Sequence, residues 1–480
     1  MNGKANIVYL HLDQLKASAT HFMGNPHAHT PFMDRMAASG IVFSSAYSPS
    51  PICTPSRTSV FTGVHPLVHQ VTCHVNRAPY NLQQVSELFY SAGYCTAVAG
   101  HYELSRNLSR GWHEQVNFRE PGPLLNSYLT LRNSGRRDVG WSAGGLGCSA
   151  EEGNSYLLTN RALRILDEIR KVKSPFFFHV AYNDPHPPYF APSPYDTLVD
   201  PNILSLPAQG QERGRPHWQN ICREQCGTDQ ATDYDIKKVV ALYYGKIAYG
   251  DAQMQRVYQG LEERRMLDNT WVIISSDHGD YAGEKGLFTK TESLYECLLH
   301  VPLIIVPPEG VPLPRGIKID DLVDITDLFP TLLQIAGIAI PDYAQGFDLL
   351  KWVRKGAKRP LRKYLFAQVG DYHGHLQTTF PGGMPAIGRH PGLLMNVRTR
   401  EFSYIHDPDF GDEAYDLTVD PNELNNLLNY DLREARPEIS ELQRQARRWE
   451  KECLTLRNRL GIIPGYRGFD VGWESLSAVP

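Results

Sequence analysis

The sequence predicts a large α/β domain with a doubly wound, mainly parallel sheet, followed by a smaller α+β domain. Through residues 6–337, short apolar runs alternate with amphipathic stretches, the pattern of strands joined by helical crossovers. After about residue 358 the alternation stops, and residues 394–406 show two short runs typical of a hairpin. A chain of 480 residues has room for two domains. We therefore expect a large domain over residues 1–358 and a smaller one over residues 359–480.

The individual elements follow from the hydrophobic period and from stop signals. Strands are predicted where a short apolar run ends in polar residues, as residues 6–12 do before Asp13. Helices are predicted where apolar residues recur about every 3.6 positions until a glycine ends them, as Gly40 and Gly93 do. Pro437 suits the first position of a last helix, where its missing N–H needs no partner. Strands are predicted over residues 6–12, 41–47, 94–99, 176–182, 270–275, 301–306, 394–398 and 402–406, and helices over residues 30–40, 81–93, 155–172, 235–267, 327–337 and 437–460.

Composition and charge restrict the class of protein. The formal net charge of −4 argues against a nucleic-acid binder, which normally carries a strong excess of basic residues. No apolar run is long enough to cross a membrane, and residues 1–5 lack the features of a signal peptide, so we expect a cytoplasmic chain. The eight cysteines lack the spacing of a disulfide framework, and we interpret Cys222 and Cys226 as ordinary thiols.

Residues 53–57, Cys-Thr-Pro-Ser-Arg, combine a nucleophile with two groups that attract anions. Thr54 and Pro55 predict a helix start with proline at the first helical position, which places Cys53 beside the helix N-terminus. Free N–H groups and the positive end of the helix dipole favour an anion there. Arg57 follows one turn later on the same side, and its planar fork of donors matches a tetrahedral oxyanion. The plainer interpretation is a proline-initiated helix with a buried cysteine.

Asp13, Asp277 and His278 each follow a predicted strand. Because the carboxyl ends of parallel strands meet at one edge of a sheet, these side chains are expected to lie together. Carboxylates with an imidazole suit a divalent cation. A single aspartate in such a place is often only a helix cap, so the prediction of a metal site depends on the combination.

Four segments resemble the type I sulfatases of the alkaline phosphatase superfamily. Cys-x-Pro-Ser-Arg at residues 53–57 is similar to the family signature. Residues 277–290, which begin Asp-His-Gly-Asp and end in Lys290, are similar to its second long motif, and residues 183–188 resemble the segment that supplies a histidine to the sulfate. Residues 415–427 resemble a C-terminal motif, so the resemblance covers nearly the whole chain. It implies an alkaline-phosphatase-like fold.

The resemblance also implies a maturation step and a mechanism. In this family a formylglycine-generating enzyme reads the Cys-x-Pro-x-Arg segment and oxidises the cysteine, here Cys53, to formylglycine. One hydroxyl of the hydrated aldehyde attacks the ester, and the second expels the sulfate. One divalent cation is implied, with Ca²⁺ as the first expectation and Mn²⁺ as the alternative. The implied metal ligands are Asp13, Gln14, Cys53, Asp277 and His278, and the implied catalytic residues are Cys53, Arg57, His186 and Lys290.

Several positions depart from the usual family pattern. Gln14 stands where many relatives have a second aspartate, as it does in choline sulfatases and phosphonate monoester hydrolases. His101 and Glu103 replace the lysine that binds sulfate and the histidine that holds the formylglycine hydroxyl. A carboxylate near a bound anion is repulsive unless protonated or paired, so Glu103 implies an altered substrate, a catalytic base or weakened activity. Asn76 lies where phosphonate monoester hydrolases have an asparagine near the transferred group.

The leading prediction is metal-dependent hydrolysis of sulfate esters through formylglycine at position 53. Hydrolysis of phosphonate monoesters or phosphodiesters is the alternative, and a non-catalytic relative that binds sulfate esters or glycans is a third hypothesis. Aryl, sugar and small alkyl sulfates stay open as substrates, and so does a homo-oligomer; neither nucleic acid nor membrane is expected as a partner. Residues 192–227, rich in Pro, Gln and Gly, and the histidine-rich residues 372–375 are expected either to line the organic part of the substrate or to be surface decoration.

Overall fold

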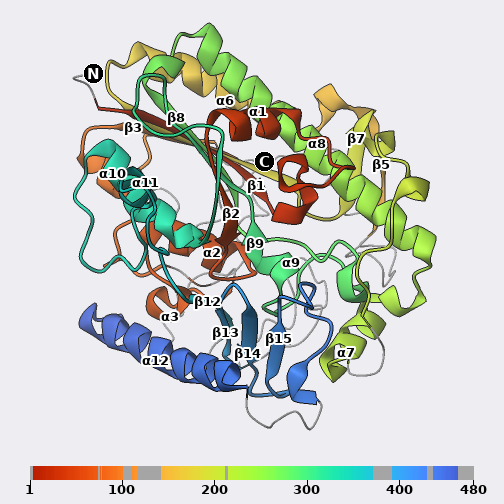
Figure 1. The fold of residues 1–480 in the computed structure, drawn as a ribbon. Helices are drawn as coiled ribbons and strands as arrows, with labels where there is room; N and C mark the ends of the chain where they lie inside the picture. The colour runs from red at the N-terminus through yellow and green to blue at the C-terminus, as the bar shows by residue number, and fades with distance from the viewer. Residues whose placement is uncertain are drawn as a thin grey trace, which may run out of the picture.

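The computed structural model confirms the α/β architecture. A large sheet with helices on both sides stands above a smaller sheet, which carries one long helix on its outer face (Figure 1). The structure describes residues 4–73, 76, 78–100, 110–116, 142–210, 215–370, 392–429 and 436–462.

The large sheet is mainly parallel, as predicted. Its strands are β1 (Asn6–Asp13), β2 (Ile41–Tyr47), β3 (Cys95–Gly100), β4 (Glu114–Val116), β6 (Phe176–Pro185), β8 (Thr270–Ser276), β9 (His300–Val301), β10 (Leu303–Val306) and β11 (Ile317–Asp324). Among the described residues the order is β11-β2-β10-β8-β1-β6-β3-β4, with β9 beside β2. Neighbours run parallel except β10, which is antiparallel to β2 and β8, and β9, which is antiparallel to β2. The central place of β1, between β8 and β6, makes its carboxyl end the middle of the functional edge.

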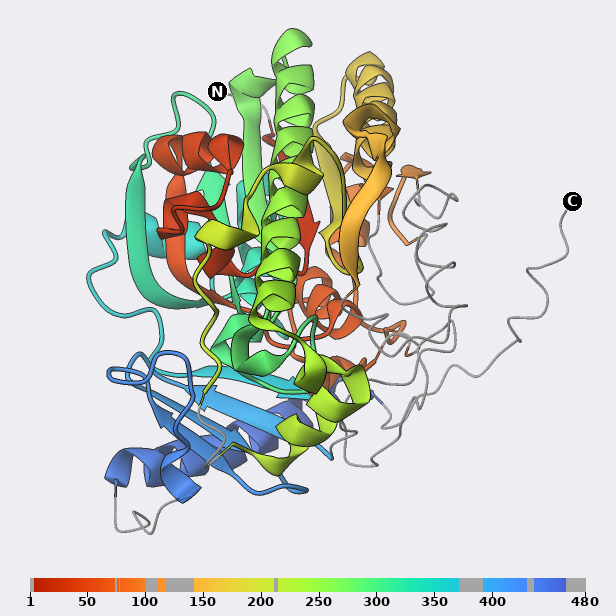
Figure 2. The ribbon, with the colours of Figure 1, turned by 90° about the vertical axis from the view of Figure 1, so that its right-hand side faces the viewer.

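Helices cover both faces of this sheet, so the domain is doubly wound. In β1, Val8, Leu10 and Leu12 belong to one buried cluster, while Ile7 and Tyr9 belong to another on the opposite face. This alternation follows from the two-residue period of a strand. The first cluster includes α1 (Pro31–Ser39), α6 (Asn154–Lys171) and the long α8 (Asp233–Glu263), which run along the face seen in Figure 2. The second includes α2 (Cys53–Thr62), α4 (Val85–Ser91), α10 (Leu328–Ala336) and α11 (Leu349–Arg354).

The smaller sheet is antiparallel, with the order β12 (Leu365–Val369), β13 (Leu394–Arg398), β14 (Phe402–His406) and β15 (Glu413–Asp416). The predicted hairpin is confirmed by β13 and β14, and the predicted last helix by α12 (Pro437–Arg459). Val397, Tyr404 and Leu442 join this sheet to α12 in a core of their own. The predicted domain boundary after residue 358 falls between β11 and β12 and stays a prediction.

Residues 192–227, expected to line the substrate or to decorate the surface, contain regular structure and a buried side chain. The segment contains the end of β7 (Tyr189–Ser193), which pairs with β5 (Ala143–Ser149), and the helix α7 (His217–Cys226). Trp218 in α7 is buried, stacks on Tyr295 at 5.9 Å between ring centroids, and donates to Glu413. The surrounding Pro, Gln and Gly hide the helical period in the sequence, and contacts with Tyr295 and with the smaller sheet stabilise the helix.

The helix predicted over residues 81–93 is shorter in the structure and begins at Val85. Gln84 is extended and forms a capping box with Glu87. The preceding carbonyls of Tyr80 and Leu82 accept hydrogen bonds from Arg110, a distant residue that the local pattern cannot reveal. Among the described residues, no helix is long and apolar enough to span a membrane.

Candidate active site

The cysteine of the 53–57 segment lies at the start of α2. Ile52 is extended, and Cys53 is the first helical residue, so the prediction that Pro55 opens the helix is wrong by two positions. The first helical hydrogen bond runs from the Ser56 N–H to the Ile52 carbonyl, at 3.0 Å. Pro55 therefore still occupies the first turn, where a missing N–H costs nothing. The expected position of Cys53 at the helix N-terminus is the one observed.

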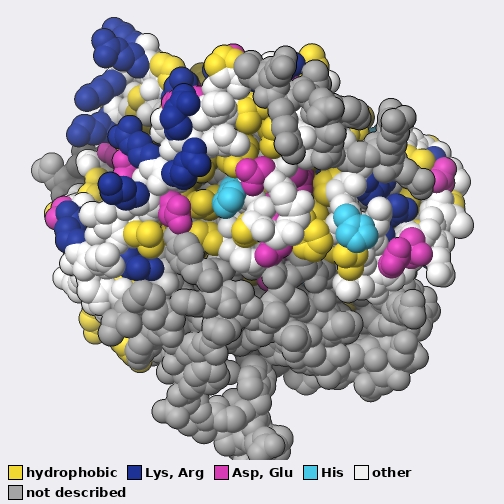
Figure 3. Space-filling model, turned by 90° about the horizontal axis from the view of Figure 1, so that it is seen from below, with side chains coloured by type: hydrophobic (Ala, Val, Ile, Leu, Met, Phe, Trp, Pro, Cys, Tyr) yellow, Lys and Arg dark blue, Asp and Glu magenta, His cyan; other side chains and the backbone are white. Residues whose placement is uncertain are grey.

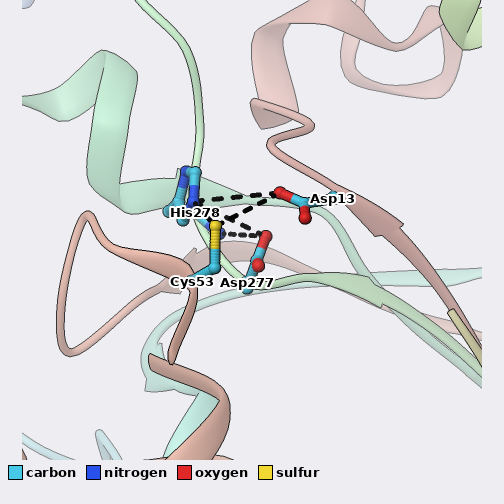
Figure 4. Close-up of side chains that lie close together, drawn as sticks. All are labelled: Asp13, Cys53, Asp277 and His278. Carbon is cyan, nitrogen blue, oxygen red and sulfur yellow. Dashed lines mark hydrogen bonds and ion pairs between the residues drawn. The ribbon is translucent and has the colours of Figure 1, made fainter. Parts of the chain in front are cut away.

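Four potential metal ligands converge at this point. One donor atom from each of Asp13, Cys53, Asp277 and His278 lies within 4.8 Å of the others, and all four residues are buried (Figure 4). The Cys53 Sγ is 3.1 Å from the His278 Nε2 and 3.6 Å from the Asp13 Oδ1. Strand register explains the convergence, because Leu12 of β1 lies opposite Ser276 of β8. The prediction that strand ends bring these side chains together agrees with this geometry.

Arg57 joins the two carboxylates. Its Nε donates to the Asp277 Oδ2 and its Nη2 to the Asp13 Oδ2, both at 2.7 Å. Burial tends to raise the pKa of Asp277, but Arg57 and His278 hold the pKa well below its usual value. Asp277 is therefore an ionised carboxylate, the form that binds a cation.

His278 is oriented as a neutral ligand. Its Nδ1 lies 2.8 Å from the Gly279 carbonyl oxygen, which only accepts hydrogen bonds, so the proton lies on Nδ1. The Nε2 lone pair then points toward the Cys53 Sγ. Burial, followed by the nearby charge of Lys290, lowers the pKa of His278 to about 3. A backbone carbonyl that fixes the tautomer in this way is typical of metal-binding histidines.

Lys290 and Gln14 complete the ring of polar groups around the thiol. The Lys290 Nζ lies 2.9 Å from the Cys53 Sγ and donates to the Gln14 Oε1 at 3.0 Å. The Gln14 Nε2 donates to the Asp280 Oδ2 at 2.6 Å. Gln14 has a φ of 67°, a left-handed conformation that turns the chain sharply after β1. Asp280 thus orients the amide, a function that the sequence did not reveal although Asp280 belongs to the 277–280 motif.

The residues fit a divalent cation. Donor atoms on opposite sides of an ion, each about 2.3–2.6 Å from it, lie at most about 5 Å apart, which agrees with the observed 4.8 Å. Two buried carboxylates also need a positive charge nearby, and here Arg57 and Lys290 supply it. Conversion of Cys53 to an oxygen-bearing residue would give a donor set rich in oxygen, the preference of Ca²⁺ and Mn²⁺.

His186 lies at the same edge of the sheet, on the other side of β1. Register pairs Asp13 with Pro185, the last residue of β6. The His186 Nδ1 is 2.7 Å from the Pro187 carbonyl oxygen. The His186 carbonyl accepts a hydrogen bond of 2.5 Å from the buried Lys246 of α8, which sequence reasoning missed because it lies 60 positions away.

Asn76 is not in this cluster. The Asn76 side-chain oxygen accepts hydrogen bonds from the N–H groups of Thr72 and Cys73, at 2.9 and 3.1 Å, so it stabilises a local turn. His101, Glu103 and the histidine-rich residues 372–375 lie outside the described residues.

His11 was also missed. It is the one titratable imidazole inside the apolar run 6–12, and its Nε2 lies 3.7 Å from the Asp277 Oδ1. Alternation along β1 places His11 on the same face as Asp13. A histidine two positions before a strand-end aspartate therefore indicates, from the sequence alone, a second polar group near the site.

Comparisons with known proteins identify the family of this chain. The chain matches the family model of sulfatases over residues 5–338 and the model of the C-terminal part of N-sulphoglucosamine sulphohydrolase over residues 283–452. It is 26% identical to arylsulfatase K of Mus musculus over 464 residues, with 89% of this chain and 76% of the relative covered. It is 27% identical to an arylsulfatase of Clostridium perfringens over 459 residues, with 89% and 90% covered.

The fold is shared with solved structures as well. A phosphonate monoester hydrolase of Agrobacterium radiobacter superposes with a TM-score of 0.75 at 21% identity, and the match covers 95% of this chain and 96% of that one. At this identity the likeness concerns the fold. The sulfatase model alone matches more than half of the chain. The chain therefore belongs to the sulfatase family, the sulfuric ester hydrolases of the alkaline phosphatase superfamily.

Proposed function

We propose that this chain hydrolyses sulfate esters of sugars, with a formylglycine made from Cys53 and one divalent cation. The observation that carries the proposal is the position of the Cys53 Sγ at the start of α2, 2.9 Å from the Lys290 Nζ and 3.1 Å from the His278 Nε2. A sugar is favoured as the organic part because the C-terminal model that matches is named for a sulphohydrolase of N-sulphoglucosamine. A formylglycine-generating enzyme is the maturation partner that residues 53–57 imply.

The cation would be held by Asp13, Gln14, Asp277, His278 and the residue at position 53, with Ca²⁺ as the first candidate and Mn²⁺ as the second. When bound, it would acidify the attacking hydroxyl and neutralise charge on the ester oxygens. The ionised Asp277 and the neutral imidazole of His278 are already in the protonation states that such binding needs.

The chain's own residues have separate functions in this scheme. Formylglycine would supply one hydroxyl that attacks sulfur and a second that expels the sulfate. Lys290 and Arg57 stabilise negative charge on the sulfate oxygens, and their burial strengthens this effect. Asp277 accepts the hydroxyl proton, and His186 protonates the leaving alkoxide. The Pro187 carbonyl orients the His186 ring through Nδ1.

The test is mutation of Cys53 together with a mass measurement. In protein made with the maturation enzyme, the peptide that contains Cys53 should show the mass of the aldehyde, and Cys53→Ala should lose turnover of nitrophenyl sulfate by at least about 1,000-fold. Cys148→Ala is the matched control, because Cys148 is a partly buried thiol in β5 and should leave the rate unchanged. Near-native turnover by Cys53→Ala would refute the proposal.

Hydrolysis of phosphonate monoesters or phosphodiesters is the second candidate. The observation in its favour is Gln14, a neutral side chain bonded to Lys290 where a carboxylate would add negative charge to the site. A ratio of kcat/KM on nitrophenyl sulfate to that on a phenyl phosphonate monoester decides between them, and a ratio well below one would favour the second candidate.

A further inference from the structure

Residues 351–363, which we call the basic segment, read Lys-Trp-Val-Arg-Lys-Gly-Ala-Lys-Arg-Pro-Leu-Arg-Lys. They contain seven basic residues and no acidic one, although the whole chain has a net charge of −4. The segment includes most of α11 and leads toward β12. A cluster of positive charges in a chain with a net negative charge creates a local positive potential, which attracts anions.

The basic side chains face solvent and are not neutralised by the protein. Arg362 is the exception, since it forms an ion pair of 2.6 Å with the buried Asp327. Among the described residues, the other six form no ion pair. They are exposed, namely Lys351, Arg354, Lys355, Lys358, Arg359 and Lys363.

An ordinary solvated helix face looks different. On α12, Arg444 pairs with Glu441 and Arg448 with Glu452, so these two cations each have a carboxylate one turn away. Lys and Arg gather on one side of the lower face of the molecule, with Asp and Glu scattered among them (Figure 3). The basic segment lacks these acidic neighbours in sequence, so its charges repel one another until an anion binds.

The segment is held in place by its apolar side. Leu349, Leu350 and Val353 of α11 are buried in the core beneath the large sheet. The Trp352 Nε1 donates to the Arg359 carbonyl oxygen at 3.0 Å, which ties the end of the segment back to the helix. The charged side chains are therefore presented on a rigid support, which lowers the entropy lost on binding.

Three of the exposed cations line a cavity. Lys351, Arg354 and Lys355 surround a space of about 360 Å³ together with Gln334 and Asp348. Asp348 is the only carboxylate in this lining, and its Oδ1 caps the start of α11 by accepting from the Lys351 N–H at 3.0 Å. The Asp348 Oδ2 is buried without a hydrogen-bond partner among the described residues, so one negative charge faces three cations, and the excess positive charge suits a sulfate group.

We propose that the basic segment is a second binding site, which takes a sulfated glycan chain and holds a polymeric substrate on the enzyme. The inference rests on the proposed sulfatase function. Because the proposed substrates are sulfated sugars, a sulfated polymer is the polyanion that we expect to bind here. Binding of this kind is electrostatic and should weaken steeply with salt. Sulfate groups along a chain would reach several of the six cations at once, which raises affinity through multivalency.

The test compares the protein with a triple variant of the cavity, Lys351→Gln, Arg354→Gln and Lys355→Gln. The probe is a heparin-derived oligosaccharide, with its desulfated form as the negative control, and binding is measured by titration at two salt concentrations. Loss of three exposed charge contacts should weaken binding at low salt by about 10-fold or more. The matched control neutralises three paired surface cations, Lys171, Arg444 and Arg448, and should retain affinity within about twofold.

Activity separates this inference from the proposed function. The triple variant should keep the native rate on nitrophenyl sulfate, because none of the three residues belongs to the Cys53 cluster, while its KM for sulfated oligosaccharide rises. Equal binding of the oligosaccharide by the triple variant and the native protein would overturn the inference, as would tighter binding of duplex DNA or of anionic vesicles. Lack of sulfatase activity in the native protein would overturn the proposed function and leave the binding result to be judged separately.

Discussion

Arg57 links the two carboxylates of the candidate site. Its Nε and Nη2 each donate at 2.7 Å to a different carboxylate, Asp277 and Asp13, which end neighbouring strands. The guanidinium therefore fixes the spacing of two candidate metal ligands, and its charge lowers the pKa of Asp277. The sequence predicts that Arg57 lies near Cys53 and binds the substrate oxyanion, but it does not reveal the two carboxylate contacts, whose partners are 44 and 220 positions away.

We expect Arg57→Lys to lower both stability and activity. Lysine keeps the charge but cannot bond both carboxylates in this geometry, and the loss of one charged hydrogen bond should cost about 1.5–3 kcal/mol. The kcat on nitrophenyl sulfate should fall by about 100-fold or more. Denaturant unfolding and steady-state kinetics measure the two effects.

Arg256→Lys is the comparison for this prediction. Arg256 also forms two side-chain hydrogen bonds, to Gln253 and Asn160, but they involve neutral partners on α8 and α6. It should lose less than about 1 kcal/mol and no activity. If both variants lose activity equally, the special function of the Arg57 fork is refuted.

At the scale of elements, α8 supports the segment that follows β6. Lys246 lies in the middle of α8, and its buried ammonium donates to the carbonyl oxygens of His186 and Pro188 at 2.5 and 3.0 Å. It also lies 3.3 Å from the Asp184 Oδ1. Burial lowers the pKa of Lys246 and Asp184 counteracts that shift. One buried cation thus holds three groups of the 183–188 segment against the helix.

We expect Lys246→Met to destabilise the protein by about 3–5 kcal/mol, because it leaves the buried Asp184 without its cation. If His186 is the general acid, the loss of kcat should be larger on an alkyl sulfate than on nitrophenyl sulfate, whose leaving group needs no proton. Urea unfolding and rates on both substrates provide the measurement.

Lys171→Met is the control for this change, since Lys171 is exposed and pairs only with Glu168. It should change stability by less than about 0.5 kcal/mol. Equal losses of kcat on the two substrates in Lys246→Met would argue that Lys246 stabilises the fold without positioning His186.

At the scale of the whole molecule, aromatic packing attaches the smaller sheet to the larger domain. Trp449 of α12 stacks on Phe366 of β12, with 5.0 Å between ring centroids, and contacts the edge of His65 at 5.4 Å. His65 lies between α2 and α3 (Pro66–His69). The Trp449 ring therefore connects the smaller sheet with the layer that carries Cys53. The two sheets are therefore expected to unfold together.

We expect Trp449→Ala to cost about 3–5 kcal/mol and to separate the two domains on unfolding. Urea titrations followed by far-ultraviolet circular dichroism and by activity should coincide in the native protein and diverge in the variant. Tyr234→Ala is the control, because Tyr234 is 53% exposed, and it should leave both curves in place. Coincident curves in Trp449→Ala would show that the sheets unfold as one unit without this contact.

Sequence alone is enough to predict the fold class, the approximate positions of the elements that it names and the candidate residues of the site. Hydrophobic period is a local property, so β2, β13 and β14 agree residue for residue with prediction. The Cys53 segment and the strand-end residues Asp13 and Asp277 were also visible, because nucleophiles and metal-binding residues follow helix starts and strand ends.

Only the tertiary structure decided which groups surround that chemistry. Asp280 orients Gln14, Lys246 holds the His186 segment, and His11 lies beside Asp277, each through contacts between residues far apart in the chain or on different elements. The same is true of α7, whose Trp218 packs in one buried cluster with Tyr295 and with residues of the smaller sheet. Local sequence encodes the hydrophobic period of an element. Strand order and register decide which residues are its neighbours, and these neighbours set the protonation, orientation and burial of the side chains in the site.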